Sequence, residues 1–196
     1  MIAIVDYGAG NMTSVKRAVE HLGFASSVSS DPDEIQRAER IIVPGVGNFR
    51  ATVALSANAL ASALANHLSA GRLLLGICLG MQWLFESSQE APGLRGLGAF
   101  AGACHPFPPQ SKSPHVGWDQ LEIRPQTRLL RGIPAGSFVY FTHSYCAPLV
   151  DDTVASCGYG APFTAAVERE NLFGVQFHPE KSGETGLAIL ENFCRC

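Results

Sequence analysis

Residues 72–82 read Arg72-Leu-Leu-Leu-Gly-Ile-Cys-Leu-Gly-Met-Gln82. An apolar run typical of a buried strand leads directly into Cys78, and residues 79–85 then favour a helix. The glycines two before and two after Cys78 leave room for a sharp turn between strand and helix. This is the sequence context of a G-x-S-x-G nucleophile elbow, with Cys in place of Ser. The alternative interpretation is a buried core cysteine, the commonest fate of a free Cys.

The same order of strand and then helix repeats through the first half of the chain. Residues 2–6 and 40–44 are apolar runs ended by turn residues, and Asn11 can cap a helix after the first run. Residues 50–70 are rich in Ala and Leu and favour one long helix. Strands joined by helical crossovers predict an α/β fold with a doubly wound, mostly parallel sheet between helices.

The second half has a different pattern. Residues 91–114 are rich in Gly and Pro and favour loop with short extended pieces. Beyond them lie five short β-type runs and a final helix, at residues 116–123, 137–143, 153–159, 163–168, 172–178 and 183–196. The short runs predict additional antiparallel strands at an edge of the sheet or in a small flanking sheet. We expect a single domain over residues 1–196.

Composition and charge exclude several classes of protein. Lys plus Arg is 14 and Asp plus Glu is 17, so there is no basic excess for nucleic acid or an anionic membrane. The chain lacks an apolar run of about 18 residues and a basic signal-peptide start. Its six cysteines show neither C-x-x-C nor zinc-ligand spacing, which favours reduced thiols in the cytoplasm and no metal. The third glycine of a dinucleotide fingerprint falls on Thr13, so no cofactor is expected.

A second motif, Phe177-His-Pro-Glu180, ends the 172–178 run. If the backbone stays extended, His178 and Glu180 point to the same side. Glu180 can then hold the imidazole in one tautomer while its other nitrogen faces a thiol. The elbow sets the sulfur of Cys78 at a helix N-terminus, where thiolate is favoured. A surface histidine is the alternative for this motif alone, but with the elbow it predicts a Cys-His-Glu triad.

A third element, Pro44-Gly-Val-Gly47, comes just after the apolar residues 40–43. Acyl transfer through a cysteine needs backbone N–H groups aimed at the developing oxyanion. One can come from Leu79, directly after the nucleophile. The other can come from Val46 or Gly47, if their strand neighbours that of Cys78. The alternative is an ordinary turn.

With these motifs, the chain resembles the class I (triad) glutamine amidotransferases, and more narrowly the glutaminase subunits of imidazole glycerol phosphate synthase. The resemblance covers essentially the whole chain, and its narrower markers are Pro44–Gly47, His115-Val-Gly-Trp118, Tyr140-Phe-Thr-His-Ser-Tyr145 and Lys181-Ser182. It implies a flavodoxin-like fold. It also implies hydrolysis of L-glutamine through a γ-glutamyl thioester on Cys78.

The resemblance implies roles for further residues. Substrate binding is implied for Gln82, Glu90, His143, Ser144 and Tyr145, and contact with a partner for Asn11, Tyr140 and Lys181. The implied partner is a separate (β/α)₈ cyclase subunit, HisF, in a heterodimer. It would use the ammonia to make imidazole glycerol phosphate and aminoimidazole carboxamide ribotide in histidine biosynthesis.

Two alternatives stay open. Another enzyme on the same scaffold, such as a stand-alone γ-glutamyl hydrolase or a different glutaminase subunit, would carry the same triad. The glutaminases of pyridoxal-phosphate synthase would show Gly-Gly-Glu-Ser at the Gly45–Asn48 position, which this chain does not. An inactive regulatory subunit would lack a member of the triad, whereas all three are present.

Overall fold

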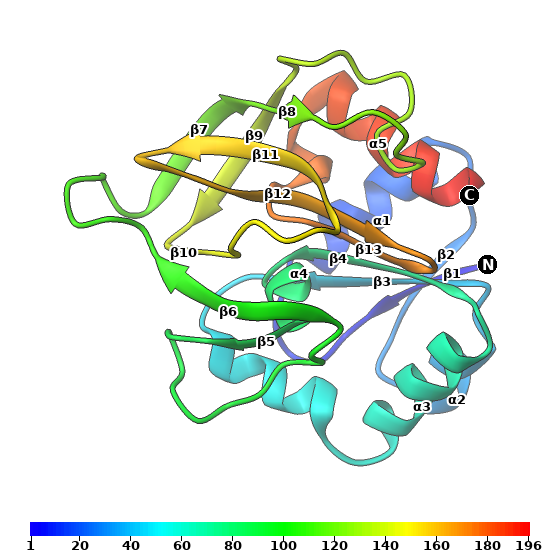
Figure 1. Ribbon diagram of the computed structural model, residues 1–196. Helices are drawn as coiled ribbons and strands as arrows, with labels where there is room; N and C mark the ends of the chain where they lie inside the picture. The colour runs from blue at the N-terminus through cyan, green and yellow to red at the C-terminus, as the bar shows by residue number, and fades with distance from the viewer.

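The structure is a computed structural model that describes residues 1–196, apart from the side chain of Asn58. An eight-stranded sheet crosses the molecule (Figure 1), in the order β2-β1-β3-β4-β13-β12-β11-β8. The strands are β1 (Ile2–Val5), β2 (Ser26–Ser29), β3 (Arg40–Gly45), β4 (Leu73–Cys78), β8 (Glu122–Ile123), β11 (Thr153–Tyr159), β12 (Ala161–Arg169) and β13 (Leu172–Val175). Pairing is parallel from β2 to β13 and antiparallel from β13 to β8. The predicted α/β fold class is confirmed.

Helices cover both faces of this sheet (Figure 1). On one face lie α1 (Met12–His21) and α5 (Gly183–Arg195), and on the other α2 (Pro32–Arg37) and α3 (Asn58–Ser69). The predicted cap of α1 is present, because the Oδ1 atom of Asn11 accepts a hydrogen bond from the backbone N–H of Ser14 at 3.3 Å.

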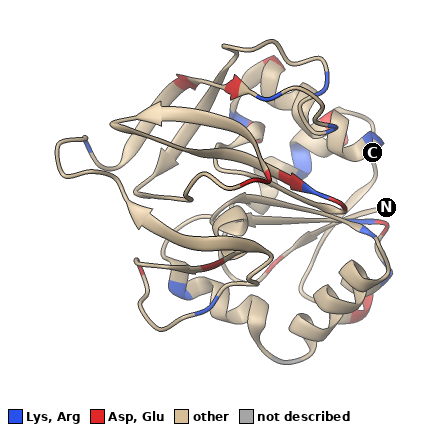
Figure 2. Ribbon diagram, viewed as in Figure 1, with Lys and Arg blue, Asp and Glu red and all other residues tan. Residues whose placement is uncertain are grey.

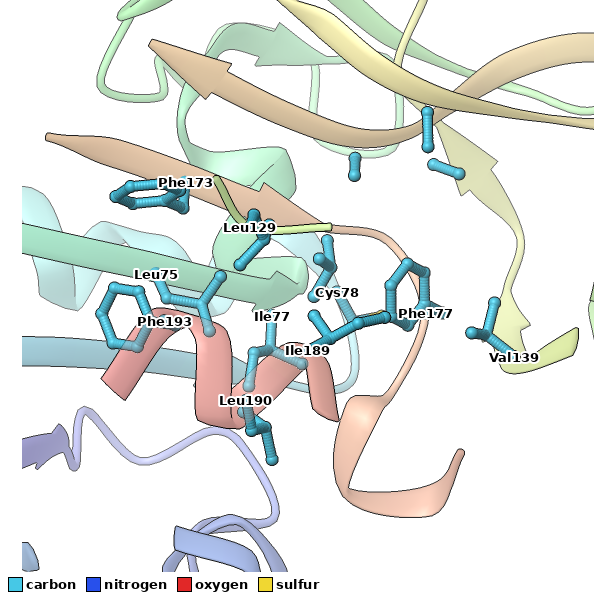
Figure 3. Packing of buried hydrophobic residues seen from close by; sticks show 14 of the residues in the cluster. Leu75, Ile77, Cys78, Leu129, Val139, Phe173, Phe177, Ile189, Leu190 and Phe193 are labelled. Carbon is cyan, nitrogen blue, oxygen red and sulfur yellow. The ribbon is translucent and has the colours of Figure 1, made fainter. Parts of the chain in front are cut away.

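The central strand β4 is apolar throughout because it is buried on both faces. Leu75 and Ile77 pack against α5 through residues such as Leu190 and Phe193 (Figure 3). Leu74 points to the opposite face and packs in the cluster that contains α2 and α3. The end of β4 therefore rests on a closely packed base.

Two smaller sheets stand beside the large one (Figure 1). They contain β5 (Phe85–Ser88), β6 (Phe100–Pro106) and β10 (Tyr145–Cys146), and β7 (His115–Gln120) with β9 (Phe138–His143). The prediction of one strand over 116–123 was wrong, since Leu121 separates β7 and β8, which join different sheets. The run at 172–178 is not only an antiparallel edge strand: β13 also pairs parallel with β4.

The long helix expected over residues 50–70 is interrupted. A 3₁₀ helix, η1 (Phe49–Ser56), is followed by Ala57 in extended conformation and then by α3. Asn48 caps the start of η1 by accepting a hydrogen bond from the N–H of Arg50 at 2.9 Å. At its end, the indole N–H of Trp83 donates a hydrogen bond to the hydroxyl of Ser56. Helix α4 (Leu79–Trp83) is also shorter than expected, because Phe85 already begins β5.

Charged residues of both signs are spread over helices, strands and loops (Figure 2). Among the described residues, no helix is long and apolar enough to cross a membrane. Nor does this part of the chain contain a group of three or more His, Cys, Asp or Glu residues placed to hold a metal ion.

Candidate active site

Cys78 ends β4 in a strained conformation, with φ 53° and ψ −106°. A positive φ is unfavourable for a residue with a Cβ, so the surroundings must hold it. The flanking glycines make this possible: a Cβ on Gly76 would lie 2.6 Å from the carbonyl oxygen of Gly80, and one on Gly80 would lie 1.9 Å from that of Val43. The sharp turn that the sequence predicts is therefore present.

Replacing Gly80 by Ala should distort this turn. The new Cβ would overlap the backbone of Val43, and β3 cannot move away without breaking its ladder with β4. We expect Gly80→Ala to lower the free energy of unfolding by about 2–4 kcal/mol. Gly158→Ala is the control, because a Cβ there meets open space. Equal denaturation midpoints for the two variants would contradict the prediction.

His178 follows β13 and pairs with Glu180. Its Nδ1 atom lies 2.9 Å from Oε1 of Glu180, and both side chains are almost fully buried. The condition of an extended backbone through Pro179 is not met, because Pro179–Lys181 form a 3₁₀ turn, η2. This turn brings the Glu180 carboxylate back to the imidazole ring. The hydroxyl of Ser182 stabilises the turn by donating a hydrogen bond to the backbone carbonyl of His178 at 2.6 Å.

The His178 ring is poised to hold a proton. Burial alone would lower its pKa, but hydrogen bonds and charge from Cys78 and Glu180 outweigh burial and raise the pKa of His178 to about 10. Because Glu180 holds Nδ1, Nε2 is the ring nitrogen available to the sulfur. The ring can therefore take and return a proton through Nε2.

The loop after β3 lies next to the elbow. β3 pairs parallel with β4, and Gly45 is directly opposite Cys78. The two segments are so close that a Cβ on Gly45 would lie 2.6 Å from the Cβ of Leu79. The predicted oxyanion site requires β3 to lie beside β4, the strand that ends at Cys78. This condition is met.

A pocket of about 330 Å³ opens above Cys78. This volume falls in the range of about 300–1,000 Å³ that is usual for small-molecule sites. Its lining includes every residue named from the sequence for the oxyanion and the substrate: Val46, Gly47, Leu79, Gln82, Glu90, His143, Ser144 and Tyr145. Pro114 and Thr142 complete the wall.

Three of these side chains are held in place. An oxygen of Glu90 accepts a hydrogen bond from the N–H of Phe49 at 2.7 Å. The carbonyl of Tyr145 accepts from Nε2 of Gln82 at 2.8 Å and, since it can only accept, also from Nδ1 of His143 at 2.9 Å. Burial lowers the pKa of His143 to about 3, so its ring is neutral.

Two buried neighbours of Cys78 were not predicted from the sequence. Gln176 donates to the Cys78 sulfur, and the Tyr7 hydroxyl lies against Gly45, where burial raises its pKa. A polar residue two positions before His178, in an otherwise apolar strand, is the signal that could have identified Gln176.

The residues expected to contact a partner lie on elements that pack together. Lys181 on η2 places its ammonium 6.0 Å from the centre of the Tyr140 ring on β9, and Asn11 caps α1, which contacts η2. Tyr140 also contacts Trp118 edge-on at 5.9 Å. Trp118 is more than half exposed, so an aromatic surface continues from this pair onto β7.

Comparison with known proteins identifies the family. The model for "Glutamine amidotransferase class-I" matches residues 3–196. Imidazole glycerol phosphate synthase subunit HisH of Chlorobium luteolum is 43% identical over 201 residues, covering 100% of both chains. The Pyrococcus furiosus subunit of the same name is 45% identical, covering 99% of this chain and 98% of its own. The chain belongs to the class I glutamine amidotransferases, and within them to the HisH subunits. The resemblance deduced from the motifs is confirmed.

Solved structures share the amidotransferase fold at low sequence identity. One glutamine amidotransferase superposes with a TM-score of 0.77 at 18% identity, covering 99% of this chain and 100% of its own. PurLQS from Thermotoga maritima gives a TM-score of 0.74 at 22% identity, covering 99% and 97%. These likenesses concern the fold alone.

Proposed function

We propose that this chain is the glutaminase subunit of imidazole glycerol phosphate synthase, hydrolysing L-glutamine to glutamate and ammonia in the cytoplasm. One observation carries the proposal. Cys78, in a strained turn that lines the pocket, interacts with His178, which is paired with Glu180 through atoms 2.9 Å apart. A nucleophile, a base and a group that orients the base are the parts that acyl transfer requires.

In the proposed reaction the Cys78 sulfur attacks the side-chain carbonyl carbon of glutamine, and His178 takes the thiol proton. The C–S bond forms while the carbonyl electrons move onto oxygen, which the N–H groups of Leu79 and the Val46–Gly47 loop stabilise. His178 returns the proton to nitrogen, the C–N bond breaks and ammonia leaves. Water then attacks the thioester, with His178 taking its proton, and releases glutamate and the thiolate.

The pocket offers groups for the rest of the substrate. The Glu90 carboxylate, held by the N–H of Phe49, is a suitable partner for the α-ammonium group of glutamine. The 143–145 segment and Gln82 line the same pocket and supply backbone and amide contacts. Glutamine specificity would then come from carboxylate, amide and backbone groups together.

The proposed partner is the cyclase subunit HisF, which would receive the ammonia. Val116, Trp118 and Phe138 are each more than half exposed on one face of the β7–β9 sheet, where the Tyr140–Lys181 pair also lies. Aromatic residues are enriched in protein interfaces, and monomeric proteins rarely expose a large contiguous apolar patch. This face is therefore the proposed docking surface.

Glutamate release from L-glutamine tests the proposal. The purified chain alone should turn over slowly, and addition of the cyclase subunit with its acceptor nucleotide should accelerate release by roughly 10–100-fold. The Cys78→Ala chain, added to the same cyclase, serves as control and should stay at background. Full activity without a partner would overturn the synthase assignment and indicate a stand-alone γ-glutamyl hydrolase.

A further inference from the structure

A chain of buried amide groups connects the pocket wall to the Cys78 sulfur. Gln82 on α4 donates through Nε2 to the carbonyl of Tyr145 at 2.8 Å and to Oε1 of Gln176 at 3.1 Å. Gln176, next after β13, donates through its own Nε2 to the sulfur at 3.6 Å. Gln176 is fully buried and Gln82 nearly so. The contact between Gln176 and Cys78 is not part of the triad.

The direction of this chain is fixed by its first member. A backbone carbonyl can only accept, so the nitrogen of Gln82 must face Tyr145. The second hydrogen of that nitrogen goes to Oε1 of Gln176, which turns the Gln176 nitrogen toward Cys78. Rotating the Gln82 amide by 180° would set its oxygen against the Tyr145 carbonyl and lose a buried hydrogen bond.

We propose that Gln176 is a positioning residue for the glutaminase reaction: it donates a hydrogen bond that favours the Cys78 thiolate, and together with the Tyr145 carbonyl it holds the Gln82 carbonyl oxygen toward the substrate. The inference rests on the proposed function and deepens it. A donor to the charged form of a group favours that form. The hydrogen bond from Gln176 matters because α4 has only five residues, so its helix dipole stabilises a thiolate only weakly.

The locked Gln82 has a chemical consequence in the pocket. Both hydrogens of its amide are used inside the protein, which leaves Oε1 as the group that this wall-lining residue offers to a ligand. An acceptor there selects a ligand with an N–H donor, such as the ammonium or carboxamide group of glutamine. Loss of Gln176 removes one of the two acceptors that hold the Gln82 amide and leaves the Tyr145 carbonyl as the other.

Gln176 differs from the other groups around the sulfur because it does not titrate. The titratable neighbours are His178 and Glu180 after β13, Tyr7 after β1, and His143 and Glu90 on the pocket wall. The Gln176 amide has no ionisable proton, so its donor is present at every pH at which the protein is folded.

The test is the pH dependence of Cys78 alkylation by iodoacetamide, followed by mass spectrometry of the Cys78 peptide. Gln176→Met, of similar shape but without a donor, should raise the midpoint of the alkylation profile by about one pH unit. This corresponds to about tenfold slower alkylation below the midpoint. The exposed Gln36→Met on α2 is the matched control and should leave the profile unchanged. In glutamine turnover, Gln176→Met should also lower kcat and raise KM, because both ends of the chain are affected.

A wild-type alkylation profile in folded Gln176→Met would overturn the proposal. Should that variant fail to fold, Gln176→Glu makes the same test, since one carboxylate oxygen still accepts from Gln82 while the other replaces the donor. It should raise the midpoint further, and an unchanged profile would overturn the proposal equally. Alkylation needs no turnover of glutamine. An inactive wild-type chain with a Gln176-dependent profile would therefore refute the proposed function alone.

Discussion

Cys78→Ala should abolish glutamine hydrolysis, with a loss of about 10⁴-fold or more in kcat, because no other group can form the thioester. The folded state should survive, since a small side chain is shortened at the strained turn and the backbone is unaltered. The measurement is glutamate release by the complex with the cyclase subunit. A loss smaller than about tenfold would mean that Cys78 is not the nucleophile and would support an inactive regulatory subunit.

A matched control separates chemistry from packing. Cys157 is equally buried, on β11, and burial raises the pKa of its thiol to about 12, which keeps it protonated and inert. Cys157→Ala should reduce stability by roughly 1 kcal/mol and leave turnover near the wild-type rate. Loss of activity in both variants would point to a general packing defect instead of a missing nucleophile.

Local patterns were enough to predict the elbow and the His178 motif, since each depends on residues close together in the chain. The relation between them was harder. The apolar run before His178 suits either an edge strand or a central one, and the sequence led us to expect the former. In the structure β13 lies beside β4, and this parallel pairing brings His178 to Cys78. Such long-range pairing follows from packing of the whole sheet.

The features that were missed also depend on distant residues. Gln176 and Cys78 are 98 positions apart, and no local signal states that the amide and the sulfur meet. At the interruption, Ser56 accepts a hydrogen bond from the distant Trp83 indole, whereas helix propensity alone favoured a continuous helix. Propensity gives the type of an element more reliably than its ends.

Glu180→Gln should keep the shape of the site and lose most of its activity, by about 10²–10⁴-fold in kcat. The carboxylate is one of two groups that raise the pKa of His178 to about 10, the other being Cys78. Without its charge, that pKa must fall, so the imidazolium needed to protonate departing ammonia is lost at lower pH. The basic limb of the kcat/KM profile should therefore move to lower pH.

The pH profile distinguishes this role from simple packing. Glu184→Gln, an exposed change of the same chemistry at the start of α5, should leave both the rate and the basic limb unchanged. A merely structural role for Glu180 would reduce the amount of active enzyme at every pH without moving the limb. A slow Glu180→Gln enzyme with the wild-type limb would therefore show that the 2.9 Å contact orients the ring but does not set its proton affinity.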